Sequence, residues 1–259
     1  MIRGSSDGLI EYTSVAGVAR VTLNRPEKRN ALNREVIAGL RAALDRAAND
    51  ANTRVILLRG EGRDFCAGMD LAGLAAGSES GVLDHLADAR MVADLFMAMR
   101  RNPRPIVAAV HGRALAGGAG LTAACDLVLA AKSAQFRYTE VDLGFVPAIV
   151  SAVLRRTVSE KHAFELLATG AGVSAEQALH LGMINHVYPD AEFDDKVEEY
   201  VAALAGKSAS AVSLTKSMLY YIDGMAFETA IEAGVQTNAL ARMTPDARRG
   251  FEQFVQKKK

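Results

Sequence analysis

The chain has 259 residues, enough for one large domain or for one domain with an appendage. Half of the residues are hydrophobic, and 30 basic side chains balance 30 acidic ones. This balance argues against a surface built for nucleic acid, and no hydrophobic run reaches the length of a membrane span.

The N-terminus lacks the apolar segment of a secretory signal, and the chain has only two cysteines, Cys66 and Cys125. Both lie in hydrophobic or glycine-rich surroundings, where we expect reduced and partly buried thiols. We therefore expect a soluble, cytoplasmic protein.

The first elements alternate between strand and helix patterns. Residues 9–14 and 18–23 alternate in polarity and predict a hairpin. Apolar side chains recur at helical spacing over residues 34–48, and Asn33 is a suitable N-cap. The short apolar run at 55–58 predicts a buried strand.

The next segment predicts a loop, a helix and a strand in turn. Residues 72–80 are rich in glycine, alanine and serine and are typical of a mobile loop. An amphipathic helix is expected over 82–100, and a strand over 106–110. The apolar face of that helix is predicted from Leu83, Leu86, Val92, Leu95, Phe96 and Met99.

A helix is expected to begin at Gly117-Gly118 and to run into Cys125-Asp126, before a strand at 127–130. Short apolar strands alternate with helices up to Val187, which indicates an α/β domain with parallel strands. We therefore expect an α/β core over residues 1–190 and a helical region over 191–259. The helices expected in that region span 193–205, 209–222, 227–241 and 245–255.

Two glycine-bearing bends each follow a hydrophobic run, one at 65–71 and the other at 112–121. Glycine lets a backbone turn and approach a ligand closely. Two such bends that face each other can aim two N–H groups at one point, which is how an oxyanion hole holds a negative charge on a carbonyl oxygen.

Five segments in this order resemble the crotonase superfamily, the enoyl-CoA hydratase/isomerase family. The resemblance covers nearly the whole chain and implies the α/β crotonase (ClpP-like) spiral of ββα units with a C-terminal helical trimerisation region. The segments are Asn24 to Leu32, Phe65 to Leu71, Pro105 to Gly120, Ala124 to Asp126, and Thr139 to Gly144 followed by Pro147.

The resemblance implies that the thioester oxygen of an acyl-CoA accepts hydrogen bonds from the N–H groups of Met69 and Gly117. It also implies that Glu140 exchanges protons with the substrate. Coenzyme A is expected over one loop and along a second one, with basic side chains near its phosphates. The residues expected to bind it are Lys28, Arg29, Ala31, Ala67, Gly68, Asp70, Leu71 and Gly118.

The family's hydratases commonly carry two glutamates, but Gly120 occupies the position of the first one. The motifs look most like bacterial hydratases of the methylglutaconyl-CoA type, so hydration of a 2-enoyl-CoA is the leading hypothesis. The alternatives are an enoyl-CoA isomerase that uses one glutamate, an acyl-CoA decarboxylase and a non-catalytic acyl-CoA-binding protein. A glutamate introduced at position 120 is expected to raise hydration if the positioning of water limits the rate.

The remaining expectations concern partners and other side chains. We expect His111 in the core or behind the site, with no metal site and no separate cofactor; a place for His85 beside the acyl pocket is the less favoured alternative. No serine lies at the Gly117 bend, which excludes a serine peptidase. Apolar faces on the late helices predict a homotrimer or homohexamer; they carry Val197, Tyr200, Val201, Leu204, Val212, Leu219, Tyr220, Phe227, Ile231 and Val235.

Overall fold

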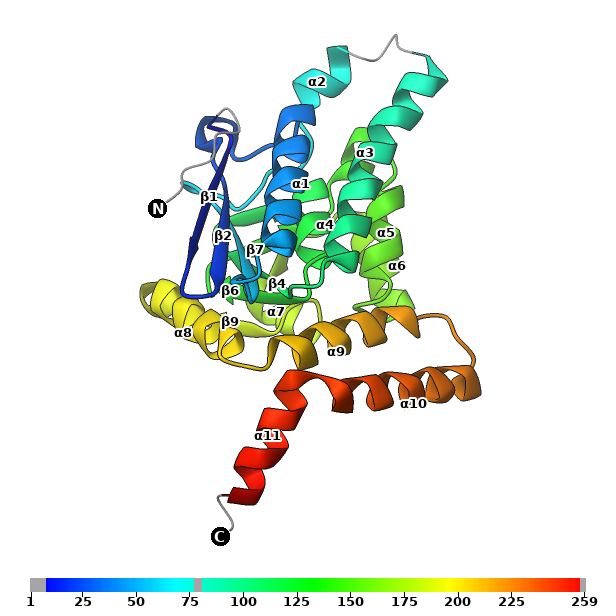
Figure 1. The fold of residues 1–259 in the computed structure, drawn as a ribbon. Helices are drawn as coiled ribbons and strands as arrows, with labels where there is room; N and C mark the ends of the chain where they lie inside the picture. Colours follow the sequence, from blue (N-terminus) through cyan, green and yellow to red (C-terminus); the bar gives the residue numbers. More distant parts are fainter. Residues whose placement is uncertain (1–7, 77–80, 257–259) are drawn as a thin grey trace.

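The computed structural model describes residues 8–76 and 81–256, whose elements are labelled in Figure 1. The strands are β1 (Ile10–Val15), β2 (Val18–Leu23), β3 (Val55–Gly60), β4 (Ile106–Val110), β5 (Arg113–Leu115), β6 (Leu127–Ala131), β7 (Gln135–Arg137), β8 (Val173–Ser174) and β9 (His186–Tyr188). The α-helices are α1 (Arg34–Asn49), α2 (Leu71–Ala76), α3 (Val82–Arg101), α4 (Gly117–Ala123), α5 (Ala148–Leu154), α6 (Glu160–Thr169), α7 (Ala175–His180), α8 (Phe193–Ala205), α9 (Ala209–Tyr221), α10 (Phe227–Met243) and α11 (Pro245–Gln256). Three short 3₁₀-helices, η1 (Pro26–Lys28), η2 (Glu140–Leu143) and η3 (Asp190–Glu192), complete the elements.

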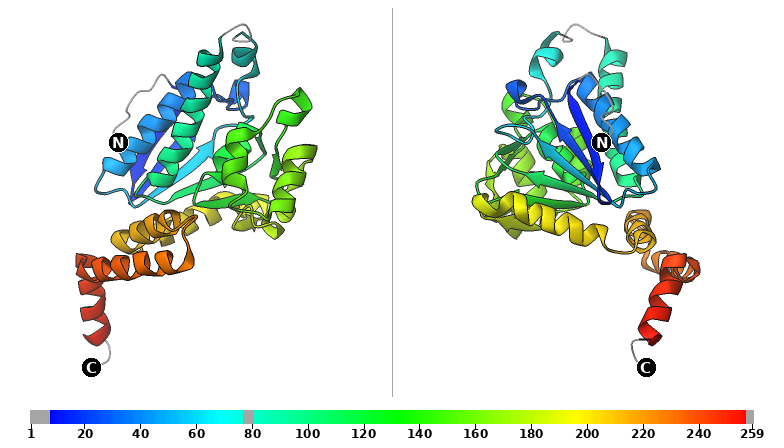
Figure 2. Two further views of the ribbon diagram at one scale, coloured as in Figure 1. Left: turned by 90° about the vertical axis from the view of Figure 1, so that its right-hand side faces the viewer. Right: turned by 60° about the vertical axis from the view of Figure 1, so that its left-hand side comes forward.

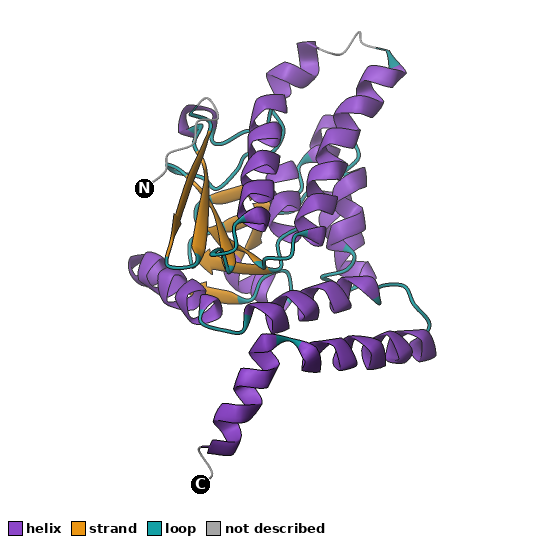
Figure 3. Cartoon of the chain, in the orientation of Figure 1, coloured by secondary structure: helices purple, strands orange, loops and turns teal. Residues whose placement is uncertain are grey.

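Two sheets organise the α/β body (Figure 3). The larger sheet has six strands in the order β1-β2-β3-β4-β6-β9, and only the β1–β2 hairpin in it is antiparallel. The smaller sheet has the order β5-β7-β8, with β5 and β7 parallel. The predicted α/β class and the predicted hairpin are confirmed.

Side chains of the large sheet alternate between two cores because successive residues of a strand point to opposite faces. Ile56 and Leu58 of β3 pack with α1 and α3 in the larger core. Val55 and Leu57 point to the other face, where α8 covers them. The central strands are therefore buried on both sides, which explains why β3 reads as a continuous apolar run.

The structure corrects three sequence predictions. The segment expected as a loop begins as helix α2, and only residues 77–80 of it lie outside the described part. Leu83 and Leu86 do not join the apolar face of α3; they are 78% and 57% exposed, whereas the later part of the helix is buried. Both cysteines are buried, Cys66 completely, and burial raises the pKa of the Cys66 thiol to about 12.

The late helices follow the predicted boundaries within two residues. Their apolar side chains differ in exposure, since several of those on α8 are buried and none of those on α10 is. Val197 and Val201 of α8 are covered by the sheet, so this face is not free for a partner. In contrast, Ile231 and Val235 of α10 are more than half exposed. Figures 1 and 2 show α10 alongside α9, on the side away from the α/β body, and α11 projecting away from both. No helix of the described chain is long and apolar enough to cross a membrane.

One buried asparagine joins the two turns that lead to the site. The Asn30 side chain accepts a hydrogen bond from the Arg25 N–H (2.9 Å) and donates to the carbonyls of Glu61 (2.9 Å) and Asp64 (2.8 Å). Its backbone has a φ of +57°, a left-handed conformation that asparagine tolerates better than most residues. Asn30 therefore fixes the turn after η1 against the turn after β3.

Asn30→Ala should lower the free energy of unfolding by about 2 to 4 kcal/mol, because it leaves several buried polar groups without partners. Urea unfolding at a fixed protein concentration measures this change. The matched control is Asn49→Ala on the exposed end of α1, which should cost less than about 1 kcal/mol. Equal effects of the two substitutions would show that the Asn30 contacts are not structural.

Candidate active site

Two glycine-bearing segments lie directly against each other. Cys66 forms an isolated parallel bridge with Ala114, and the Leu115 N–H donates to the Cys66 carbonyl (2.9 Å). Gly68 has a φ of +91°, and a Cβ at this position would lie 2.8 Å from the Leu115 carbonyl oxygen. Only a residue without a side chain permits this approach.

The N–H of Met69 points toward the second segment. Leu32 donates to the Gly68 carbonyl (2.7 Å) and accepts from the Asp70 N–H (2.8 Å). In an extended chain the N–H groups of neighbouring residues point to opposite sides, so the Met69 N–H faces away from Leu32. A Cβ on Gly117 would lie 3.7 Å from the Met69 nitrogen, which places the two residues side by side.

The N–H of Gly117 is free because Gly117 is the first residue of α4, and the first turn of a helix has no internal acceptors. Neither this N–H nor that of Met69 has an acceptor among the described residues. The two adjacent free donors have the chemistry of an oxyanion hole.

Ala116 provides the turn that starts α4. Its φ of +48° and ψ of −121° form a strained combination for a residue with a Cβ. Its N–H donates to the Arg137 carbonyl at the end of β7 (2.7 Å). Next to it, a Cβ on Gly118 would collide with the Cys66 carbonyl, so this glycine is needed for packing; its predicted contact with coenzyme A stays a prediction.

Glu140 reaches the same edge of the small sheet. Leu115 and Arg137 pair at the ends of β5 and β7, so Gly117 and Glu140 follow two neighbouring strand ends. Glu140 begins η2, and its Oε2 atom is buried with no hydrogen-bond partner among the described residues. Burial raises the pKa of this carboxyl group, as a general acid–base near neutral pH requires.

Neighbouring contacts hold Glu140 in place. Its backbone carbonyl accepts from the Phe145 N–H (3.0 Å). Arg137 donates to the carboxylate of Asp142 (2.8 Å) and to the Gly170 carbonyl. These bonds fix η2 between β7 and the end of α6.

The position of the absent first glutamate is filled by protein. A Cβ on Gly120 would lie 2.5 Å from Cγ2 of Val150 on α5 and 3.2 Å from Cζ of Phe96 on α3. Both side chains are buried. The expectation that Gly120→Glu raises hydration is therefore not supported, because the glutamate has no room.

The residues predicted to bind coenzyme A come from two loops that meet. The Ala67 N–H donates to the Arg29 carbonyl (2.9 Å), and both Lys28 and Arg29 are exposed. Asp70 is committed to the loop itself, since its carboxylate accepts from Arg25 (2.7 Å), which lowers the pKa of Asp70. Of the other predicted contacts, Ala31 is buried and Leu71 is exposed.

Sequence reasoning gave no role at the site to Arg25 or Phe96, and it placed Val150 only within a segment, 145–150, expected to form the wall of the acyl pocket. Arg25 lies inside a segment that carries the family resemblance, which could have revealed it. Phe96 and Val150 carry no signal other than hydrophobicity, because their contact with Gly120 depends on the packing of α3 and α5.

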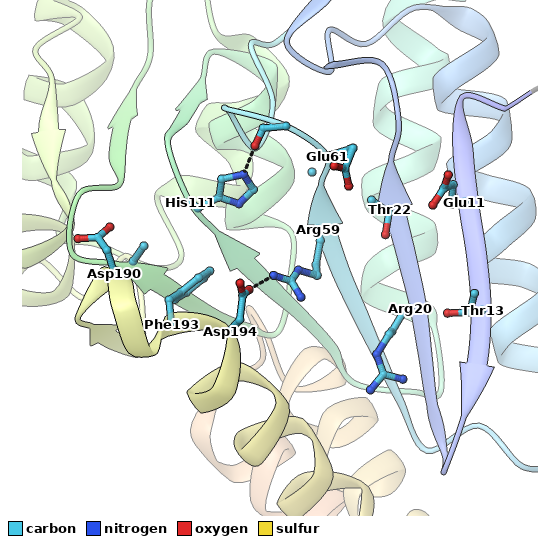
Figure 4. A pocket seen from close by; sticks show the side chains of 13 residues that line it. Glu11, Thr13, Arg20, Thr22, Arg59, Glu61, His111, Asp190, Phe193 and Asp194 are labelled. Carbon is cyan, nitrogen blue, oxygen red and sulfur yellow. Dashed lines mark hydrogen bonds and ion pairs between the residues drawn. The ribbon is translucent and has the colours of Figure 1, made fainter. Parts of the chain in front are cut away.

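His111 lies in a groove apart from Met69, Gly117 and Glu140. Its Nε2 is 2.8 Å from the Gly62 carbonyl, in a groove of about 570 Å³ between β1–β3 and the start of α8 (Figure 4). Arg59 forms an ion pair with Asp194 across the same groove. Met69, Gly117 and Glu140 do not line it, so His111 is not brought to the oxyanion donors. The described residues contain no cluster of side chains that could hold a metal ion.

Comparisons with known proteins agree on one family. The sequence model of the family described as Enoyl-CoA hydratase/isomerase matches residues 13–259. A Thermus thermophilus protein whose name includes enoyl-CoA hydratase is 39% identical, with 93% of this chain and 95% of the relative covered. The crystal structure of an enoyl-CoA hydratase from Mycobacterium smegmatis is similar with a TM-score of 0.92 and 34% identity over 96% of both chains. Human enoyl coenzyme A hydratase domain-containing protein 3 is similar with a TM-score of 0.91 and 29% identity, over 96% of this chain and 98% of that chain.

Gly120→Glu should lower the free energy of unfolding by at least about 3 kcal/mol, because it overpacks the core and buries a charge. Gly172→Glu is the control, since a Cβ there meets no atom within 4 Å. Thermal unfolding of the two variants measures the difference. A stable Gly120→Glu protein with raised hydration would contradict the packing described above.

Proposed function

The chain belongs to the enoyl-CoA hydratase/isomerase family and has its α/β crotonase fold, and on this premise we propose that it hydrates a 2-enoyl-CoA with Glu140 as its single acid–base group. The observation that carries the proposal is that two adjacent free N–H donors and a glutamate whose Oε2 is buried without a hydrogen-bond partner follow neighbouring strand ends of the small sheet. The name of the Bacillus subtilis relative, "Probable enoyl-CoA hydratase", supports the same reaction at 32% identity over 93% of each chain.

In the proposed mechanism the thioester oxygen accepts hydrogen bonds from the Met69 and Gly117 N–H groups. The Glu140 carboxylate takes a proton from water as the hydroxyl oxygen bonds to C3. The C2=C3 electron pair then forms a double bond between C1 and C2, and the carbonyl electron pair moves to the thioester oxygen. The N–H donors stabilise the resulting enolate. The protonated Glu140 then delivers its proton to C2, which gives a 3-hydroxyacyl-CoA.

The support for the substrate lies in the groups around the donors. The Met69 side chain lies beside Gly117, and Phe96 and Val150 close the space next to Gly120. We propose a short or branched acyl group of the kind used by hydratases of the methylglutaconyl-CoA type. Coenzyme A would lie over Lys28, Arg29 and Ala31 and along Ala67, Gly68, Asp70, Leu71 and Gly118.

One observation favours a second candidate, a Δ3,Δ2-enoyl-CoA isomerase. Gly120 provides no carboxylate to orient a water, and its neighbours there are the apolar side chains of Val150 and Phe96. An isomerase consumes no water, since one carboxylate can remove a proton from C2 and return it to C4. The ratio of turnover on trans-2-enoyl-CoA to turnover on 3-enoyl-CoA separates the two reactions.

Glu140→Gln should lower kcat on the preferred substrate at least about a hundredfold, the usual scale for the loss of a general acid–base group. KM should barely change, because the coenzyme A loops are elsewhere. Since burial raises the pKa of Glu140 and the base must be ionised, the wild-type rate should rise with pH through a pKa above the usual carboxyl range. Steady-state kinetics across pH, with Glu165→Gln on the exposed face of α6 as control, measure both effects. Wild-type turnover by Glu140→Gln would refute the mechanism.

We also propose that the chain forms a homotrimer or homohexamer. The support is the set of apolar side chains on α9 and α10 that are more than half exposed: Leu219, Phe227, Ile231, Val235 and Leu240. An isolated monomer would leave these apolar side chains in water, which is unfavourable for so many on two neighbouring helices.

Light scattering at micromolar concentration should therefore give a mass of three or six chains. Ile231→Asp with Val235→Asp should shift the mass toward that of one chain, because each buries a charge in the proposed interface. Glu228→Asp on the same helix is the control. A stable wild-type monomer would contradict the proposal.

A further inference from the structure

A buried lysine links the C-terminal helices to the helix that begins at the oxyanion donor. Lys216 lies on α9, which runs along the end of the α/β body, and is 7% exposed (Figures 1 and 2). Its ammonium group donates to Oδ2 of Asp126 (2.7 Å) and to the carbonyls of Met99 (2.9 Å) and Arg104 (3.1 Å). All three of its N–H bonds are thus used.

Asp126 accepts hydrogen bonds from three donors on two elements, α9 and β4. Besides Lys216, its Oδ2 accepts from the N–H of Ile106 at the start of β4 (2.7 Å), and its own N–H donates back to the Ile106 carbonyl (2.9 Å). Its Oδ1 accepts from the Tyr220 hydroxyl, one turn after Lys216 on α9 (2.6 Å). Hydrogen bonds to a carboxylate in this number and of this length hold the partly buried Asp126 side chain in one position.

This network ends three residues after the two-turn helix α4, whose first residue is Gly117. It also holds Met99, one helical turn after Phe96, and the Phe96 ring lies against Gly120 in the middle of α4. Lys216 therefore fixes α3 and the exit of α4 relative to each other. A shift of α4 would move the Gly117 N–H, and a shift of α3 would move the Phe96 ring that lies against Gly120.

We propose that Lys216 and Tyr220 are positioning residues for the oxyanion donor Gly117 and act through Asp126. The inference rests on the proposed function, because it assumes that Gly117 binds the thioester oxygen. It goes beyond that function by making the geometry of the reaction depend on α9, a helix outside the site.

The test compares two variants with a control in the full-length protein. Lys216→Met keeps the length of the side chain without its charge, and Tyr220→Phe removes only the hydroxyl group. Lys207→Met, in the exposed turn before α9, is the control. The measurements are kcat, KM, the melting temperature and the ultraviolet absorbance of bound acetoacetyl-CoA, whose enolate form the oxyanion donors stabilise.

Displaced donors should lower kcat by at least about tenfold in Lys216→Met and by about two- to fivefold in Tyr220→Phe, because small displacements at a reacting centre reduce the rate steeply. KM should stay within about twofold of the wild-type value in both variants. The enolate absorbance should fall in the same order and stay unchanged in Lys207→Met. A purely structural role would lower the melting temperature and leave kcat and the enolate absorbance of the folded protein unchanged.

Wild-type kcat and enolate absorbance in Tyr220→Phe and in folded Lys216→Met would overturn the inference. If Lys216→Met does not fold, Tyr220→Phe decides alone. Glu140→Gln separates this failure from failure of the proposed function. Wild-type turnover by that variant would show that Glu140 is not the base, whereas the enolate absorbance reports on the N–H donors independently of Glu140. Absence of enolate absorbance in the wild-type protein would overturn both.

Discussion

The close contact between two backbone segments is the constraint on which the site depends. The carbonyl of Cys66 lies where a side chain at Gly118 would be. A Cβ on Gly68 would likewise lie 2.8 Å from the Leu115 carbonyl oxygen and 2.9 Å from the Ala116 Cβ. This approach puts the N–H groups of Met69 and Gly117 next to each other. The two sheets, the turn fixed by Asn30 and the strained Ala116 all serve to hold these segments at this separation.

Among the described residues, two carboxylates that support the structure each have a cation as partner, whereas Glu140 does not. The buried carboxylate of Asp64 and the partly buried carboxylate of Asp126 are each paired with a cation, Arg113 and Lys216 respectively. Glu140 has no such partner, and its Oε2 is left without a hydrogen bond. Because a buried carboxyl group without a cation is costly in its ionised form, a chain that keeps one has a use for its proton.

The sequence was sufficient for the features that depend on local pattern. Asn33 caps α1 as expected, and the boundaries of α8 match because Pro189 and the apolar spacing mark them. Glu140 and Gly117 could be named only because their motifs resemble a known family. The contact of Val150 and Phe96 with Gly120 could not be predicted, since it joins three helices that are distant in sequence. Exposure of Leu83 was also beyond the sequence, because apolar spacing does not show where a helix leaves the core.

The filled space beside Gly120 also restricts how this site could change over time. A carboxylate could be tolerated at position 120 only after Val150 had become smaller, since its Cγ2 atom occupies the place of the new Cβ. A smaller residue at 150 would by itself open a cavity and reduce stability. Each substitution is thus harmful alone and compatible only with the other. A change from one carboxylate to two at this site therefore requires both substitutions, and either one made first lowers the stability of the protein.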